Sequence, residues 1–236
     1  MTPKQLFDAG QVRGAEAALS AHLREHPTDT GSRTFLFELL CFSGQYDRAG
    51  KHLGVLSQGT KQAELGAVLY YSALHAEKLR HELFRKEEFP RAEAAPSPPG
   101  RLNGKPFQSI RDADPDIGAR LEVFAAGAYL WIPFQHIASV RMKPPGRLRD
   151  MLWSPAFVLT GPGFQGTDIG EVLIPAIYPF SWRAADASLW LGRATEWFRD
   201  EAGREYPAGQ KIFLVDGEEV PLLEIRELEF DLDAAA

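Results

Sequence analysis

The sequence predicts an α+β fold, in which an all-helical N-terminal half precedes a C-terminal domain built on a mostly antiparallel sheet. Three observations predict this organisation. Residues 1–88 carry apolar side chains at the three-and-four spacing of helices. Residues 89–106 are rich in Pro and Gly, and from residue 107 onward short runs of β-branched and aromatic residues alternate with Gly and Pro. We therefore expect a helical domain at 1–88, a Pro-rich linker at 89–106 and an α+β domain at 107–236.

The helical half contains an internal repeat. Gly10 and Gly44 lie 34 residues apart, and the same displacement places Ala15 on Ala49. This period is typical of tetratricopeptide repeats, in which a Gly ends the first helix of each pair and a small Ala lets the second helix approach closely. The sequence therefore predicts about one and a half to two such repeats, followed by a long final helix around residues 63–88. An ordinary helical bundle with coincidental glycine spacing is the alternative.

Stacked helical hairpins of this type present the first helix of each pair along a concave surface, which binds peptides or helices. From spacing alone we expect six side chains to line that surface and to contact a protein partner. The alternative is that several of the six face the C-terminal domain instead. The six are Thr34, Glu38 and Cys41 on one helix and Val68, Ser72 and His75 on the last.

The C-terminal domain is expected to consist of short strands interrupted by one helix. The helix is predicted at Ala184–Ala202, where apolar residues recur at helical spacing. Glycine and proline separate the extended runs, which indicates a sheet with short connections. The expected strands are Leu121–Phe124, Ala128–Phe134, Ala138–Met142, Ala156–Thr160, Glu171–Ile177, Lys211–Val215 and Val220–Phe230.

Composition excludes several classes of function. The chain has 26 basic and 32 acidic residues and a formal net charge of -6, so it has no overall positive field that would favour nucleic acid or an anionic membrane. No stretch approaches the roughly 18 apolar residues of a membrane span, and the N-terminus lacks the apolar run of a signal peptide. A single cysteine, Cys41, agrees with a reducing compartment. We therefore expect a cytoplasmic protein.

Two motifs resemble ligand sites only in part. Residues Gly161–Gly166 have the spacing of a dinucleotide-binding loop, but strand-like residues follow where a helix would have to receive the pyrophosphate. A hairpin loop is therefore the better interpretation. His22 and His26 lie four apart on a predicted helix, yet no third metal ligand is close in the sequence. We expect no catalytic residue, no cofactor and no metal ion.

A rival hypothesis is an enzyme whose site lies in the C-terminal domain. It would be a hydrolase that uses His136, Arg149 and Asp150, or a nucleotide-binding protein that uses the Gly161 loop. An enzyme requires a closed pocket in which these side chains converge, whereas an adaptor requires a broad apolar groove with charges at its rim.

Several short motifs are arranged along nearly the whole chain in one order. They are Asp29–Phe42, Ala73–Glu77, Asp112–Pro115, Leu121–Phe124, Trp131–Phe134, Pro144–Trp153 and Tyr178-Pro179. In their number and order these motifs resemble the ImpE family, also called SciE or TagJ, whose members are accessory proteins of type VI secretion systems. The Pro-rich segment at 95–99 and the loop at 161–166 depart from the family's pattern.

The resemblance implies a non-catalytic adaptor. It would bind the small subunit of the contractile sheath through that subunit's N-terminal helix, near the ATPase that recycles sheaths. Docking of an amphipathic helix in an apolar groove is a known recognition mode that requires no catalytic residue. We therefore expect a protein that assists sheath assembly or disassembly, and the sequence leaves open which domain supplies the contact.

Overall fold

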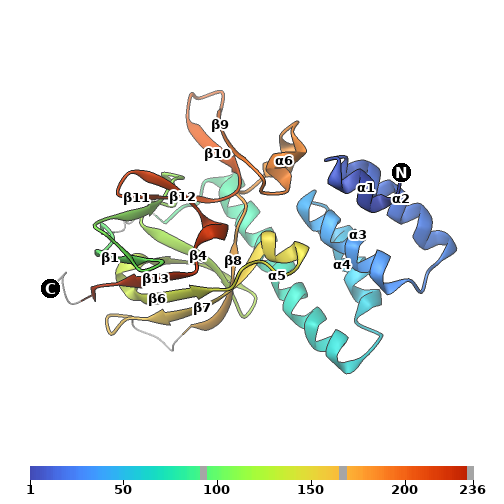
Figure 1. The fold of residues 1–236 in the computed structure, drawn as a ribbon, viewed down its shortest axis with the longest axis horizontal. Coiled ribbons are helices and arrows are strands. Elements are labelled where there is room, and N and C mark those ends of the chain that lie inside the picture. The colour runs from blue at the N-terminus through green and yellow to red at the C-terminus, as the bar shows by residue number, and fades with distance from the viewer. Residues whose placement is uncertain (91–94, 165–168, 233–236) are drawn as a thin grey trace.

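The structure, a computed structural model, describes residues 1–90, 95–164 and 169–232 (Figure 1). The N-terminal helices form one side of the molecule, and the long helix α5 lies between the shorter helices and the sheet. The order of helices followed by an antiparallel sheet confirms the predicted α+β class. The helices of this half are α1 (Pro3–Asp8), α2 (Val12–Glu25), α3 (Thr30–Phe42), α4 (Tyr46–Leu56) and α5 (Lys61–Lys86).

Side-chain caps determine where three of these helices begin. Thr2, Asp29 and Thr60 precede α1, α3 and α5, and each accepts a hydrogen bond from the backbone amide three residues later, at 3.2, 3.0 and 3.1 Å. Amides in the first turn of a helix have no partner within the helix, so each cap satisfies a group that would otherwise be unpaired.

The turns that end α1 and α3 have the same backbone geometry. Gly10 and Gly44 have φ angles of 75° and 72°, a region that glycine enters without steric cost. In both turns the glycine amide donates to the carbonyl three residues earlier, at Phe7 (2.9 Å) and at Cys41 (3.2 Å), which is the pattern of a glycine helix cap. The 34-residue repeat therefore extends to backbone geometry. Its assignment to the tetratricopeptide class stays a prediction.

Within the described residues, the C-terminal half contains an eight-stranded antiparallel sheet in the order β2-β1-β13-β6-β7-β8-β4-β5. A three-stranded sheet, β12-β11-β3, packs beside it, and the β9–β10 hairpin extends away from the sheets at the top of Figure 1. The strands are β1 (Gly100–Leu102), β2 (Lys105–Phe107), β3 (Ile110–Asp112), β4 (Arg120–Ala125), β5 (Ala128–Pro133), β6 (Ile137–Met142), β7 (Trp153–Thr160), β8 (Gly170–Pro175), β9 (Thr195–Arg199), β10 (Glu205–Gly209), β11 (Ile212–Val215), β12 (Glu218–Pro221) and β13 (Glu227–Phe230).

Each run predicted as a strand overlaps an observed strand, and the last run overlaps two. The 3-10 turn η4 (Leu222–Glu224) interrupts it, so that β12 and β13 belong to different sheets. Three further 3-10 turns, η1 (Phe134–His136), η2 (Leu148–Met151) and η3 (Ser181–Arg183), connect elements of this half.

The Pro-rich segment 89–106 is more than a linker, because β1 and most of β2 lie inside it. Gly100 allows this pairing, since a Cβ at that position would overlap the backbone carbonyl of Glu229 in β13. Pro106 lies on β2, at the edge of the sheet, where a residue without an amide hydrogen leaves no gap in the ladder. Residues 91–94 of the segment lie outside the described residues.

The predicted helix at Ala184–Ala202 is wrong. The helical part is the single turn α6 (Ala187–Trp190), and β9 occupies Thr195–Arg199. Gly192 has a φ of 61° and ends the helical path. The apolar residues beyond it then alternate between the two faces of the β9–β10 hairpin, so a pattern with helical spacing is divided between two kinds of element.

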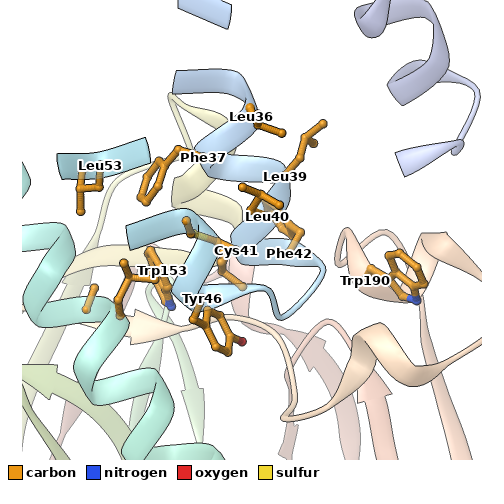
Figure 2. Packing of buried hydrophobic residues seen from close by; sticks show 14 of the residues in the cluster. Leu36, Phe37, Leu39, Leu40, Cys41, Phe42, Tyr46, Leu53, Trp153 and Trp190 are labelled. Atoms are coloured by element: carbon orange, nitrogen blue, oxygen red, sulfur yellow. The ribbon is translucent and has the colours of Figure 1, made fainter. Parts of the chain in front are cut away.

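One hydrophobic core joins the two halves of the chain. Phe37, Leu40 and Cys41 of α3 pack in the same cluster as Trp153 of β7 and Trp190 of α6 (Figure 2). A second core lies within the C-terminal half, between the large and the small sheet. The helices are therefore packed onto the C-terminal half, and Cys41 packs in this core, although its spacing had predicted a place on a partner-binding surface.

Candidate functional site

The α3 residues predicted to line a partner-binding surface lie mostly in the interior. Glu38 and Cys41 are 8% and 2% exposed. The Glu38 carboxylate accepts a hydrogen bond from Arg149 of η2 at 2.7 Å. Thr34 is half-buried, and its hydroxyl donates to the carbonyl of Thr30 at 2.8 Å. The Glu38 side chain therefore faces the C-terminal half, which was the alternative to its place on a partner-binding surface.

The three predicted residues of α5 follow the spacing of one helix face, but each has different surroundings. Val68 is exposed, and Ser72 is half-buried beside the β4–β5 turn, where a Cβ added to Gly127 would lie 3.7 Å from it. His75 is exposed and lines a separate hollow between α4 and α5 together with Tyr71. The structure therefore does not bring the six predicted residues together in one surface.

An apolar groove of about 470 Å³ runs between α5 and the large sheet. Leu69 and Tyr70 of α5 form one wall, and Phe124, Phe157 and Leu173 of β4, β7 and β8 form the other. Charged side chains also line the groove, namely Arg141, Lys143 and Glu171. This is the broad apolar surface with charged groups that an adaptor requires.

The α5 wall continues outside the groove as an exposed apolar stripe. Leu65, Val68 and Leu69 are 65%, 60% and 49% exposed, and their three-and-four spacing places them on one side of the helix. Across the groove Phe157 is 48% exposed. Single exposed apolar residues are ordinary, whereas a contiguous set beside a groove marks an interaction surface.

Buried charges hold α5 against the sheet. The Arg80 guanidinium, 1% exposed, binds both carboxylate oxygens of Glu122 in β4, at 2.8 and 3.1 Å. It also donates to Glu77 at 3.1 Å and to the carbonyl of Ile177 at 3.0 Å. The second Glu77 oxygen accepts from the indole of Trp153 at 2.7 Å. Because these partners come from α5, β4, β7 and the segment after β8, the network fixes the position of the groove's α5 wall.

The network continues to the small sheet. Lys211 forms ion pairs with Glu122 and with Asp112 of β3, and the Tyr178 hydroxyl donates to Asp112 at 2.9 Å. Burial by itself would raise the pKa of Glu122, but the charges of Arg80 and Lys211 outweigh burial and lower it to about 2. Glu122 is therefore ionised at neutral pH, and its role is to bind the two cations.

The residues of the rival hydrolase hypothesis have separate partners. Arg149 binds Glu38 and the Tyr70 hydroxyl, each at 2.7 Å. Asp150 accepts two backbone amides of its own turn, at 2.9 and 3.0 Å. The His136 ring lies beside Phe164, with ring centroids 6.4 Å apart. No contact that links the three side chains into an acid, base and nucleophile set is observed among the described residues.

The remaining ligand motifs add no site in the part of the chain that the structure describes. Residues 165–168 of the Gly-rich loop lie outside it, and Gly161–Phe164 form a turn closed by a 3.0 Å hydrogen bond. In residues 1–90, 95–164 and 169–232, no three His, Cys, Asp or Glu side chains are placed to share a metal ion. No helix in these ranges is both long and apolar enough to cross a membrane.

Residues 104–229, more than half of the chain, match the family described as ImpE protein. The chain belongs to the ImpE family. This ImpE chain is also 31% identical to the type VI secretion system accessory component TagJ of Pseudomonas aeruginosa, over 98% of its own length and 92% of that protein's. Its fold is similar to a crystal structure of a protein from Vibrio parahaemolyticus, with a TM-score of 0.82, 20% identity and 97% of each chain covered. The predicted family membership is confirmed.

Sequence reasoning missed the main features of the ImpE chain's groove. Leu65 and Leu69 were recognisable as apolar helix positions, but spacing does not show which side of a helix the sheet leaves uncovered. Phe157 lies in a predicted strand, and nothing in the sequence pairs that strand with α5. The ion network joins Arg80, Glu122 and Lys211, which are far apart in the chain, so no local motif signals it.

Proposed function

We propose that this protein is a non-catalytic accessory component of type VI secretion that binds the small subunit of the contractile sheath through that subunit's N-terminal helix. Membership of the ImpE family and the likeness to TagJ support the secretion role. The groove beside α5 supports the binding role. In this proposal the protein acts in the cytoplasm and assists sheath assembly or ATPase-driven disassembly.

The observation that carries the proposal is the exposed apolar stripe beside the groove. Leu65, Val68 and Leu69 remain in contact with water, although burying a side chain of this size stabilises a structure by about 1.5 to 3 kcal/mol. An amphipathic helix laid along α5 would cover them and would contact Phe157 on the other side. Recognition of this kind depends on apolar anchors at helical spacing.

The dimensions of the groove suit a short helix. The stretch of α5 from Leu65 to Ser72 spans seven residue steps, which is about 10 Å or two helical turns. The β4–β5 turn beside Ser72 lies at one end of this stretch. Lys143 and Glu171 supply charges of both signs, so a helix with a charged polar face would find partners along the groove.

Arg80 joins α5 to the sheet through Glu122, so the helix that forms one wall of the groove is held in place before a partner binds. A preformed site loses less conformational entropy on binding than one that must be ordered first. The network therefore supports binding without contacting the partner.

Isothermal titration of the purified chain with a synthetic peptide of the cognate sheath subunit's N-terminal helix tests the proposal. We expect saturable binding and no binding of a peptide with the same composition in scrambled order. Equal binding of both peptides, or binding of neither, would overturn it.

A further inference from the structure

A second hollow, separate from the groove, lies at the other end of α5. Its volume is about 350 Å³, which is at the small end of ligand pockets. Four segments form it: the end of α5 with the residues that follow, the loop after β3, the segment around η3, and the β9–β10 hairpin. None of the residues that line the groove lines this hollow.

Aromatic rings make up much of its wall. Phe84 and Phe89 meet with centroids 5.1 Å apart, and Phe198 of β9 stacks on Tyr206 of β10 at 6.0 Å. Phe180 lies on the η3 side. Both aromatic pairs line the same hollow, so an apolar side chain that enters it would meet ring surfaces.

The hollow is lined by three arginines (Arg85, Arg183 and Arg204) and three aspartates (Asp114, Asp116 and Asp200), and the arginines differ in how they are paired. Arg204 is paired with Glu87, Asp200 and Asp116, at 2.7, 3.2 and 3.6 Å. Arg183 instead lies over the Phe180 ring, 4.2 Å from its centroid, and forms no ion pair within the described part of the chain. An exposed guanidinium held on an aromatic ring is oriented to bind a carboxylate through two parallel hydrogen bonds.

A buried acid lies on another wall of the hollow. Asp114 is 5% exposed and accepts a hydrogen bond from the backbone amide of Asp116 at 3.0 Å. Burial, together with the negative charge of Asp112, raises the pKa of Asp114 to about 7. Near neutral pH a large fraction of Asp114 is therefore protonated and does not repel an anion.

We propose that this hollow binds the C-terminal residue of a protein partner, with the free carboxylate on Arg183 and an aromatic or branched side chain among Phe180, Phe198 and Tyr206. A C-terminal residue is favoured because it carries a carboxylate and an apolar side chain on the same carbon. Arg183 and the aromatic wall lie at the same small hollow, so a ligand that uses both must carry a carboxylate close to an apolar side chain. This inference does not rest on the sheath-binding proposal.

The test uses the peptide acetyl-Ala-Ala-Phe, as free acid and as C-terminal amide, added to the full chain and followed by NMR. The acid is expected to bind saturably. The dissociation constant of the amide should be higher by about tenfold or more, because the charge-assisted pair with Arg183 is lost. Arg183→Gln should reduce binding of the acid by a similar factor. The matched control is Arg193→Gln, since Arg193 also lies over an aromatic ring, Phe7, but does not line the hollow.

Equal binding of acid and amide, no shift change at millimolar peptide, or acid binding that Arg183→Gln leaves unchanged would each overturn the proposal. The unfolding midpoint of each variant shows whether its fold is intact. If Arg183→Gln does not fold, Tyr206→Ala tests the aromatic wall in its place, and binding by that variant equal to the native chain's would count against the proposal. Leu69→Asp in the groove should leave this binding unchanged.

Discussion

Trp182 of the C-terminal half lies directly against Gly44, the glycine that ends α3, so closely that a Cβ at Gly44 would overlap the indole. The same indole packs edge-on against Tyr46 and His81, with centroids 5.8 and 4.5 Å away. Gly44 therefore has two roles, since it allows the left-handed turn of the helical hairpin and it admits the side chain that joins the halves. The equivalent Gly10 has the first role only, because an added Cβ would meet nothing within 4 Å.

The two glycines provide a matched pair of substitutions. Gly10→Ala should reduce the free energy of unfolding by roughly 1 to 2 kcal/mol, the cost of a left-handed backbone at alanine. Gly44→Ala should cost at least about 1 kcal/mol more, because Trp182 must also move. Urea unfolding of both variants measures the difference. Equal losses of unfolding free energy would show that the close contact between Gly44 and Trp182 does not contribute to stability.

Removing Arg80 should be strongly destabilising. Arg80→Leu leaves Glu77 and Glu122 buried with fewer partners, and breaking a buried ion pair from one side typically costs about 3 to 5 kcal/mol. Lys4→Ala serves as the control, because the Lys4–Asp8 pair is exposed and should contribute at most about 1 kcal/mol. A loss below about 1 kcal/mol for Arg80→Leu would contradict the anchoring role of the network.

Asp114 should make stability depend on pH. Its pKa is about 7 in the folded chain and 3.8 as the reference for the unfolded chain. Because the folded state holds the Asp114 proton more tightly than the unfolded state, protonation stabilises the fold. This stabilisation is fully present below pH 3.8 and is lost as pH rises through 7. Asp112, Asp116 and Lys211 are the charged groups that act on it.

Asp114→Asn removes that dependence. At pH 8 the variant should be more stable than the native chain by up to roughly 4 kcal/mol, which is the free energy equivalent of the raised pKa. The advantage should shrink toward pH 4. Denaturant unfolding at several pH values measures it, and parallel curves for the two proteins would show that Asp114 does not titrate in this range.

The predicted and observed structures agree where local pattern and packing demand the same element. The Gly10 and Gly44 turns were predictable because a glycine in the left-handed region is a common way to close a helix end. The strand at Gly100 could not be predicted, because its pairing depends on a close approach to Glu229, which is far away in the sequence. The helix predicted at Ala184–Ala202 failed because the hairpin with β10 overrides the periodicity.

The site was predicted less well than the fold. Helical spacing placed Glu38 and Val68 on one partner surface, yet the packing of α3 against the C-terminal half buries Glu38 against Arg149. Exposure of Val68 and Leu69 depends on where the sheet ends, which is a property of the tertiary structure.

The central claim is that the groove beside α5 binds the sheath subunit's N-terminal helix. Two leucines of α5 test this claim most directly. Leu69 lines the groove, whereas Leu79, also on α5 and 40% exposed, does not. Titration of the helix peptide against Leu69→Asp and Leu79→Asp compares the same change inside and outside the groove. We expect Leu69→Asp to weaken binding by about tenfold or more and Leu79→Asp to leave it unchanged. Native affinity in Leu69→Asp, or equal losses in both variants, would contradict the claim.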